Sequence, residues 1–495
     1  MKRLRASFFP PIALDPESRN PMYRQLYDWF RQAILNGQLR PGQRVPSTRA
    51  LAAELKVSRI PVLGAFEQLH AEGYLQTFVG SGTVVARSIP DDIAHPRKGS
   101  PSPVTRERGP RKLSRAGSEM RSLPPQAWLN RLGAFRVSLP ALDHFPVSIW
   151  SKLVARHARS TVKELLAYAD PMGHLPFRQA IAEYLGTVRA VRCDPAQVMV
   201  VTGSQQGLQL SARVLLDPGD YVWMEDPGYP GARQALTTFG ARLFPVPVDS
   251  EGLNIEHAIR RCPKARAAYI TPSHQYPLGM TLSAARRMRL LDWATRNGAW
   301  VMEDDYDSEF RFGARPFASL QGLDNDARVV YIGTFSKVLF PSLRVGYIVV
   351  PKDLISAFAA ARDASDIFSS TLYQLVLTDF IREGHFARHI RRMRLLYMER
   401  RSTLIDAMRE KIGSKLVLVS AEAGMHLVGL LPRGVDDMEV ARAAAQSGIA
   451  AMPLSSCCLR HPARGGLILG YGGADQKQIQ EGVQKLAGIL RKVSA

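Results

Sequence analysis

The sequence lacks the features that place a chain in a membrane or in an oxidising compartment. No run of roughly 18 or more apolar residues occurs among its 495 residues, so no transmembrane helix is expected. The basic N-terminus carries only a short apolar patch, broken by prolines and acids, and so lacks the core of a signal peptide. Its 4 cysteines show no CxxC spacing and predict neither a metal site nor a disulfide framework. We therefore expect a cytoplasmic protein with reduced thiols and no membrane association.

Negative charge is also scarce. The chain has 65 Lys and Arg against 44 Asp and Glu, a formal net charge of +21. Residues 1–130 hold 20 Lys and Arg against 10 Asp and Glu, so about half of the excess lies in about a quarter of the chain. This asymmetry predicts a polyanionic partner for the N-terminal part, nucleic acid first. A merely basic and soluble surface is the alternative that charge leaves open.

Three helices and a hairpin are predicted near the N-terminus. Apolar residues recur at helical spacing over residues 22–34, Ser47 can cap a second helix, and a third helix runs to about Gly73. Two extended segments follow between residues 74 and 86. Three short helices followed by a β-hairpin describe a winged helix-turn-helix.

Two stretches of this module, LRPGQRVPSTRALAAELKVSR and FEQLHAEGYLQTFVGSGTVVA, resemble the GntR family of bacterial DNA-binding domains. The resemblance implies that Arg49, Ser58 and Arg59, at the starts of the second and third helices, contact DNA. It places Gly80 and Ser81 at the tip of the wing. Arginine suits this role because it can pair with a phosphate or read guanine in the major groove.

The module departs from the family pattern directly after Arg59. Family members commonly carry small polar residues there, whereas this chain has Ile60-Pro61. A proline in the first helical turn removes no intrahelical hydrogen bond, so the helix is expected to persist. It biases Ile60 away from helical geometry, and the polar readers are lost. DNA binding is therefore expected, and the sequence preference is left open.

Residues 87–126 change in composition to Pro, Ser, Arg and Gly, and apolar periodicity vanishes. We interpret them as a flexible basic tether whose charge adds non-specific DNA affinity; a structured loop packed on the second domain is the alternative. The predicted domains are the winged helix-turn-helix at 1–88, the linker at 89–130 and a body at 131–495, with a large part at about 165–375 and a small part at about 376–495.

From about Ala134 onward, apolar strands alternate with helical stretches, which indicates an α/β fold with a largely parallel sheet. No internal repeat or heptad is evident. Buried strands are expected at residues 198–201, 221–224, 241–246, 267–270, 300–302, 329–332 and 345–350.

Lys337 lies between the last two of these strands. Burial would lower the pKa of its ammonium group, and a neutral amine can attack an aldehyde. An exposed loop lysine is the alternative. Residues 202–208, TGSQQGL, follow a strand and open a helix, where free N–H groups and the helix dipole form an anion site. Arg344 offers a second phosphate ligand.

Two more residues could contact an aromatic cofactor ring. A carboxylate of the acidic run at 303–307, which includes Asp304 and follows the strand at 300–302, could hold a protonated pyridine nitrogen. Tyr229 lies in a Pro- and Gly-rich turn and could stack on the ring. A solvated acidic loop is the ordinary alternative for Asp304, and each signal is weak by itself. The order of the glycine turn, the aromatic residue, the acidic run and the lysine along one α/β body is what predicts a function.

That order resembles the fold type I pyridoxal phosphate (PLP) enzymes, the aspartate aminotransferase superfamily, over about 360 residues. A GntR-type domain ahead of such a body resembles the MocR/GabR family of transcriptional regulators. The resemblance implies a large, mostly parallel sheet domain and a small C-terminal α+β domain. The motifs that carry it are AYADPMGHLPFRQAIAEYL, VTGSQQGL, WMEDPGYPGAR, ITPSHQYPLGMTLS, MEDDYDSEF and GTFSKVLFPSLRVGY.

The resemblance also implies roles for single residues. Lys337 would hold PLP as an internal aldimine, Asp304 would pair with the pyridine nitrogen, and Tyr306 would approach the ring hydroxyl. Tyr229 would stack on the ring. The phosphate group would be surrounded by Ser204, Gln205, Ser336 and Arg344.

One turn differs from the enzymes, which often carry Asn-Pro-Thr-Gly with the asparagine on the ring oxygen. Here residues 274–279 read HQYPLG, with Tyr276 in the asparagine position, as is usual in the regulators. His274 or Tyr276 would take over part of that role. For an effector carboxylate, Arg464 is the candidate, with Arg460 behind it, although both could be surface charges.

The predicted function is a PLP-dependent, DNA-binding transcriptional regulator that senses an amino compound, or PLP itself, at Lys337. Its partners would be a double-stranded DNA operator with paired half-sites, the amino compound, and a second copy in a head-to-tail homodimer. An active aminotransferase with an accessory DNA-binding domain is the alternative, and transaminase activity would otherwise be weak at most. A DNA-binding protein with a cofactor-free body is a third reading.

Overall fold

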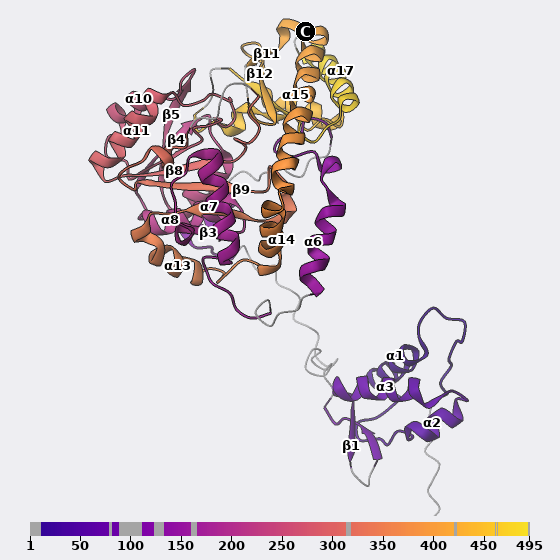
Figure 1. Cartoon of the computed structure of the whole chain (residues 1–495). Helices are drawn as coiled ribbons and strands as arrows, with labels where there is room; N and C mark the ends of the chain where they lie inside the picture. Colours follow the sequence, from indigo (N-terminus) through magenta and orange to yellow (C-terminus); the bar gives the residue numbers. More distant parts are fainter. Residues whose placement is uncertain are drawn as a thin grey trace, which may run out of the picture. The chain divides into compact units, whose positions relative to one another are not determined.

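The structure is a computed structural model that describes residues 11–78, 82–88, 111–122, 133–159, 166–312, 318–419, 423–460, 462 and 464–493. It divides into two compact units, residues 1–112 and 113–495, which are described separately below (Figure 1). None of the helices in the described residues is long and apolar enough to cross a membrane.

The first unit is a winged helix-turn-helix, as predicted. Ser47 caps α2 by accepting a hydrogen bond from the Ala50 N–H at 3.2 Å. The buried rings of Phe30 on α1 and Phe66 on α3 meet edge to face at 5.2 Å between centroids. The elements are α1 Met22–Leu35, α2 Thr48–Glu54, α3 Arg59–Ala71, and the antiparallel strands β1 Leu75–Phe78 and β2 Gly82–Val85.

The second unit is built on an eight-stranded sheet with the order β3-β10-β9-β8-β7-β4-β5-β6. The strands from β9 through β8, β7 and β4 to β5 run parallel to their neighbours. Strand β10 is antiparallel to both β3 and β9, and β6 is antiparallel to β5. The strands are β3 Val198–Val201, β4 Tyr221–Asp226, β5 Arg242–Asp249, β6 Gly252–Leu253, β7 Ala267–Ile270, β8 Trp300–Asp305, β9 Val329–Thr334 and β10 Gly346–Val349.

Helices cover both faces of this sheet, which explains why its strands are apolar without alternation. Successive strand residues point to opposite faces. On β3, Val201 belongs to the same buried cluster as Leu208 of α8, whereas Val200 belongs to the cluster that contains Phe177 of α7. The helices of the large part are α6 Val147–Arg159, α7 Leu175–Arg189, α8 Ser204–Leu215, α9 Pro230–Phe239, α10 Ile255–Arg261, α11 Ala284–Asn297, α12 Leu320–Leu323, α13 Ile355–Asp363 and α14 Thr371–Arg382. A short helix, α5 Arg115–Ser122, precedes them.

A smaller antiparallel sheet with the order β11-β12-β14-β13 forms the C-terminal part. The predicted α/β body with a small C-terminal α+β part is therefore confirmed. Its strands are β11 Val417–Val419, β12 His426–Leu430, β13 Met452–Pro453 and β14 Gly466–Gly470, and its helices are α15 His385–Lys411, α16 Asp437–Gln446 and α17 Gln476–Val493 (Figure 1).

Parallel strands bring their carboxyl ends to one edge of a sheet, and ligand sites form at that edge. Strand β3 ends just before Gly203, β8 ends at Asp305, and β9 ends at Thr334. The segments that sequence analysis singled out therefore converge, although more than 130 residues separate the first from the last.

Candidate functional site

A cavity of about 370 Å³ lies at this edge of the sheet. Eight of the nine residues predicted to contact a cofactor line it: Ser204, Gln205, Tyr229, Asp304, Tyr306, Ser336, Lys337 and Arg344. The ninth, His274, is absent from the lining and contacts Tyr306 instead. Sequence analysis missed Ser138, Gln234, Thr334 and Pro341, which also line the cavity. Ser138 carries no local signal because its neighbour Lys337 is 199 residues away.

Lys337 follows β9 and extends into the cavity. Burial lowers the pKa of its amine to about 8, while the carboxylates of Asp307 and Asp304 oppose that change. Its Nζ donates one long hydrogen bond, 3.5 Å, to the backbone oxygen of Ser138. A weakly held amine with a lowered pKa can act as a nucleophile near neutral pH.

Asp304 lies at the end of β8 and is buried. Its Oδ2 accepts a hydrogen bond from the Tyr269 hydroxyl at 2.8 Å, but its Oδ1 has no hydrogen-bond partner among the described residues. Burial raises the pKa of this carboxyl to about 7, against the lowering effects of Tyr269 and Lys337. A buried acceptor without a donor calls for an explanation, and a protonated ring nitrogen in the cavity would supply the missing hydrogen bond.

An anion site forms where α8 begins. Gly203, with φ of +99°, makes the turn that exposes the first N–H groups of this 12-residue helix. A Cβ at Gly203 would lie 3.2 Å from the Arg344 guanidinium, which donates to the Thr202 oxygen at 2.7 Å. The nearby Ser336 hydroxyl is buried and has no partner in the described part of the chain. Helix dipole, guanidinium and free hydroxyl together suit a phosphate group.

Aromatic side chains form the walls of the cavity. Tyr229 stands directly before α9, and its ring lies 5.5 Å from that of Tyr276 at an interplanar angle of 76°. The rings of Tyr276 and Tyr306 lie 5.9 Å apart, also at 76°. Such walls leave flat apolar space for a heteroaromatic ring.

The residues present therefore fit PLP: an acceptor for a ring nitrogen, a site for a phosphate and an amine for an aldehyde. Two unsatisfied buried oxygens, Asp304 Oδ1 and Ser336 Oγ, are the observations on which this fit rests.

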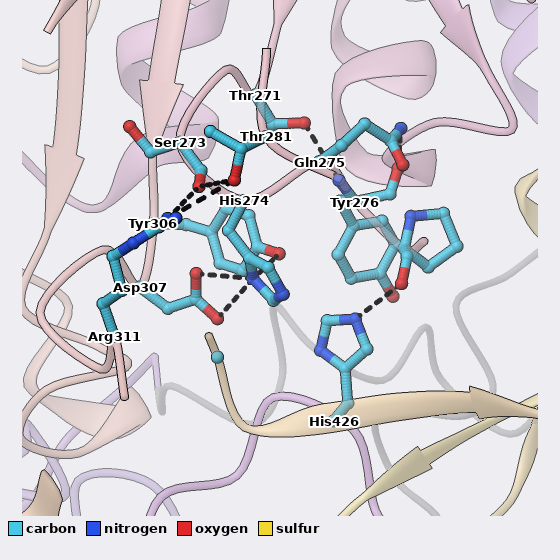
Figure 2. Close-up of polar contacts among 12 residues, drawn as sticks. Thr271, Ser273, His274, Gln275, Tyr276, Thr281, Tyr306, Asp307, Arg311 and His426 are labelled. Carbon is cyan, nitrogen blue, oxygen red and sulfur yellow. Dashed lines mark hydrogen bonds and ion pairs between the residues drawn. The ribbon is translucent and has the colours of Figure 1, made fainter. Parts of the chain in front are cut away.

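His274 lies behind Tyr306 and is buried, as is Asp307. Figure 2 shows the imidazole between Tyr306 and the carboxylate of Asp307. Its Nδ1 lies 2.9 Å and 3.1 Å from the two Asp307 oxygens and 2.9 Å from the Tyr306 hydroxyl. Asp307 was not singled out by sequence analysis, although it belongs to the same acidic run as Asp304.

The two arginines predicted for an effector carboxylate line a different cavity, of about 660 Å³, in the small C-terminal part. The Arg464 Nε donates to the backbone oxygen of Leu431. The backbone N–H of Arg460 donates to Asp226 at 3.2 Å. Neither side chain lines the cofactor cavity.

In the first unit, the predicted DNA contacts stand exposed at the starts of two helices. Arg49 lies in the first turn of α2, and Ser58 and Arg59 begin α3. The Arg59 Nε donates to the Thr48 hydroxyl at 3.3 Å, which links the two helix starts. Ile60 follows with 80% of its surface exposed. Gly80 and Ser81, the predicted wing tip, lie outside the described residues.

Comparison with known proteins assigns each unit separately. Residues 142–486 match the family of class I and II aminotransferases, and residues 22–85 match the gntR family of bacterial regulatory proteins.

The curated relatives that cover both units include the following two regulators. One is the probable rhizopine catabolism regulatory protein MocR of Rhizobium meliloti, 42% identical over 96% of this chain and 95% of that protein. Another is the pyridoxine biosynthesis transcriptional regulator PdxR of Corynebacterium glutamicum, 31% identical over 95% of this chain and 96% of that protein.

Among solved structures, the α-aminoadipate aminotransferase LysN of Thermus thermophilus, complexed with N-(5'-phosphopyridoxyl)-L-leucine, has a TM-score of 0.72. It is 29% identical and covers 77% of this chain and 98% of its own. The likeness to regulators therefore spans the whole molecule, whereas the likeness to this enzyme is confined to about three quarters of it.

Proposed function

The chain belongs to the MocR-type family of transcriptional regulators, in which a GntR winged helix-turn-helix precedes a PLP-dependent aminotransferase-like domain, and we propose that it senses an amino compound, or PLP itself, at Lys337. The observation that carries this proposal is the cavity that Lys337 lines together with Asp304 and Ser336, whose buried Oδ1 and Oγ have no hydrogen-bond partner among the described residues.

In this proposal the side chains of the cavity divide the recognition of PLP among them. Lys337 provides the amine for the aldehyde, Asp304 the acceptor for the ring nitrogen, and Tyr229 the surface for the ring. When bound, PLP supplies an electron sink to which an amino compound can be attached. The phosphate group would be held by Ser204, Gln205, Ser336, Arg344 and the N-terminus of α8.

The DNA partner in this proposal is an operator with paired half-sites. Arg49, Ser58 and Arg59 are exposed at adjacent helix starts, where guanidinium groups can reach phosphates and base edges. Two half-sites require two winged helices, and a head-to-tail homodimer would supply them, with the basic linker at 89–130 tethering each winged helix to its own body. Such a regulator would act in the cytoplasm, where its operator lies.

The test follows PLP and DNA binding in the same purified protein. PLP should produce a visible absorption band that borohydride reduction fixes to Lys337, and one member of a panel of amino acids should perturb that band. The same compound should change the mobility shift of operator DNA. A band that responds to an amino compound while DNA binding stays constant would contradict the sensing role.

The second candidate is a working aminotransferase, favoured by the likeness of the body to LysN. Sustained turnover of an amino donor and a keto acid would support it, whereas a single spectral change without turnover supports the sensor. Substituting Arg464 by Ala probes the effector carboxylate. If Arg464 binds it, the variant should bind PLP normally and respond only to higher effector concentrations, whereas Arg433→Ala, at an exposed arginine of the same part, should behave as the wild type.

A further inference from the structure

His274 Nδ1 has two hydrogen-bond partners and can satisfy only one of them in the ordinary way. It faces the Asp307 carboxylate at 2.9 and 3.1 Å and the Tyr306 hydroxyl at 2.9 Å (Figure 2). A ring nitrogen with a proton donates, and one without a proton accepts. Whether His274 Nδ1 carries a proton therefore decides whether the Tyr306 hydroxyl donates its hydrogen bond to His274 or to another acceptor.

The opposite nitrogen of the ring decides the tautomer. His274 Nε2 is buried and has no hydrogen-bond partner among the described residues. A proton on Nε2, in the other tautomer or in the imidazolium ion, would leave a buried N–H without an acceptor, which costs about 1–3 kcal/mol or more. A neutral ring protonated on Nδ1 leaves only a lone pair unused. His274 is therefore assigned as the Nδ1–H tautomer, which donates to Asp307.

With that proton in place, Tyr306 cannot donate to His274. The Tyr306 oxygen lies 2.9 Å from His274 Nδ1 and can accept part of the Nδ1–H hydrogen bond. The Tyr306 O–H therefore needs an acceptor other than His274. Tyr306 lines the cofactor cavity, together with Lys337 and Asp304. The ring oxygen of PLP is an acceptor of the kind that this hydroxyl would need.

The small C-terminal part holds the imidazole in place. A Cβ at Gly424 would lie 2.1 Å from His274 Cε1 and 2.8 Å from Asp307 Oδ2, so the Gly424 backbone closes over both side chains. That backbone is itself fixed, since its N–H donates to the Phe310 oxygen at 2.8 Å and its oxygen accepts from the Tyr471 hydroxyl at 2.7 Å. Close walls on this side leave the imidazole little freedom to turn.

We propose that Asp307 and His274 are positioning residues, which do not contact the cofactor but direct the Tyr306 hydroxyl into the cavity as a donor to the cofactor's ring oxygen. This inference rests on the proposed PLP site and deepens it. It also explains the sequence in the turn 274–279, where Tyr276 replaces the asparagine of the enzymes. The histidine of that turn serves the ring oxygen through Tyr306.

The test compares PLP affinity and the absorption maximum of the bound cofactor among variants at fixed pH. Asp307→Asn keeps the shape of the side chain but removes its negative charge and replaces one of the two oxygens that face Nδ1 by an N–H donor, so the Nδ1 proton is no longer favoured. We expect its PLP affinity to fall about 5- to 10-fold, the effect of one hydrogen bond, with a shifted absorption maximum. Tyr306→Phe should cause the same change. Because both act on one hydrogen bond, the double variant should resemble Tyr306→Phe alone.

Two further variants separate positioning from packing. His274→Asn keeps a donor near the Nδ1 position and should retain most of the wild-type spectrum, whereas His274→Phe should lose it. The matched control is Asp379→Asn. Asp379 on α14 contacts His157 on α6 at 2.8 Å, and neither residue lines the cavity. This control should leave affinity and spectrum unchanged. Circular dichroism melting of each cofactor-free variant identifies any that fail to fold.

The outcomes are distinct. If the wild type binds no PLP, the proposed function fails and this inference fails with it. If the wild type binds PLP and Asp307→Asn changes nothing, only the inference fails. Additive effects of Asp307→Asn and Tyr306→Phe would likewise overturn it, because independent contributions exclude a shared hydrogen bond.

Discussion

Asp304 and Ser336 are buried and Lys337 is half-buried where strands of the sheet end, whereas the side chains assigned to DNA stand exposed where two helices begin. Burial changes the chemistry of the first group. The amine of Lys337 has a pKa lowered to about 8, and the carboxyl of Asp304 has one raised to about 7. Arg49 and Arg59 are instead exposed, as contact with a long polyanion requires.

One chain thus performs two kinds of recognition with opposite exposure of the side chains involved. A cofactor that reacts must be held by groups that water would otherwise satisfy, and the unsatisfied Asp304 Oδ1 and Ser336 Oγ are the signs of such a site. A long polyanion must be met by groups that reach outward, and its binding is weakened by salt. The cavity should thus respond to pH, and the DNA-binding face to ionic strength.

The largest effect expected from breaking this contrast is at Lys337. Lys337→Ala removes the amine, so borohydride reduction in the presence of PLP should attach no cofactor to the cavity. Mass spectrometry of the reduced protein measures this directly. Lys352→Ala, at an exposed lysine in the same part of the body, should be labelled like the wild type. Cavity labelling that survives Lys337→Ala would show that another amine holds the cofactor.

Next in size is the loss of an outward-facing charge. Arg59→Ala should weaken DNA binding by about 1–3 kcal/mol, and for a phosphate contact it should reduce the slope of log affinity against log salt by about 1. Fluorescence anisotropy over a range of salt concentrations measures both quantities. The control is Arg296→Ala, at an exposed arginine of the body that pairs with Asp292. An Arg59→Ala protein with wild-type affinity at every salt concentration would remove α3 from the interface.

The third prediction concerns pH and the cofactor-free protein. The pKa of Asp304 is raised from 3.8 to about 7 on folding, so the native state binds the extra proton in this window. Its contribution to stability is therefore present below about pH 4 and is lost as pH rises to about 7. The asparagine of Asp304→Asn does not ionise, so this variant should not show that loss of unfolding free energy, which is on the order of 2–4 kcal/mol.

Thermal unfolding of the cofactor-free protein from pH 4 to pH 8 measures that effect. The melting temperature of Asp304→Asn should fall less steeply than that of the wild type, by a few degrees in total. Asp363→Asn, at an exposed aspartate on α13, should follow the wild-type curve. Parallel curves for Asp304→Asn and the wild type would mean that Asp304 is ionised in the folded protein throughout.

The smallest effect is expected at Ile60, which tests whether an exposed apolar group also reads DNA. Its side chain is 80% exposed, so Ile60→Ala should change stability by less than about 0.5 kcal/mol. An apolar side chain at the start of a recognition helix can contact a thymine methyl group. The variant should therefore bind its preferred sequence several-fold more weakly and scrambled DNA equally well.

Competition between a selected sequence and scrambled DNA measures this ratio. Val147→Ala, at a valine of the body that is 60% exposed, should not alter it. Equal losses on both DNAs would assign Ile60 a non-specific role.

Much of the molecule was predictable because the signals are local. Helical periodicity and a capping Ser47 predicted the winged helix, and apolar runs predicted the strands of the large sheet. The glycine turn before Ser204 predicted the start of α8 for the same reason. Lys337, Tyr229, Arg344 and the acidic run at 303–307 could be singled out because each stands at the end of a predicted strand, and the family resemblance selected Asp304 within that run.

Which of these groups meet, and in which protonation state, depends on tertiary packing. Periodicity specifies which residues are buried but not the direction of a strand, so β10 could not be placed antiparallel between β3 and β9. Two contacts of the site could not be predicted from local sequence patterns, because their partners are far apart in the chain. Ser138 and Lys337 are 199 residues apart, and His274 and Asp307 are 33 residues apart. A hydrogen-bond partner and a pKa are properties of the packed interior, where distant segments exclude water from one another.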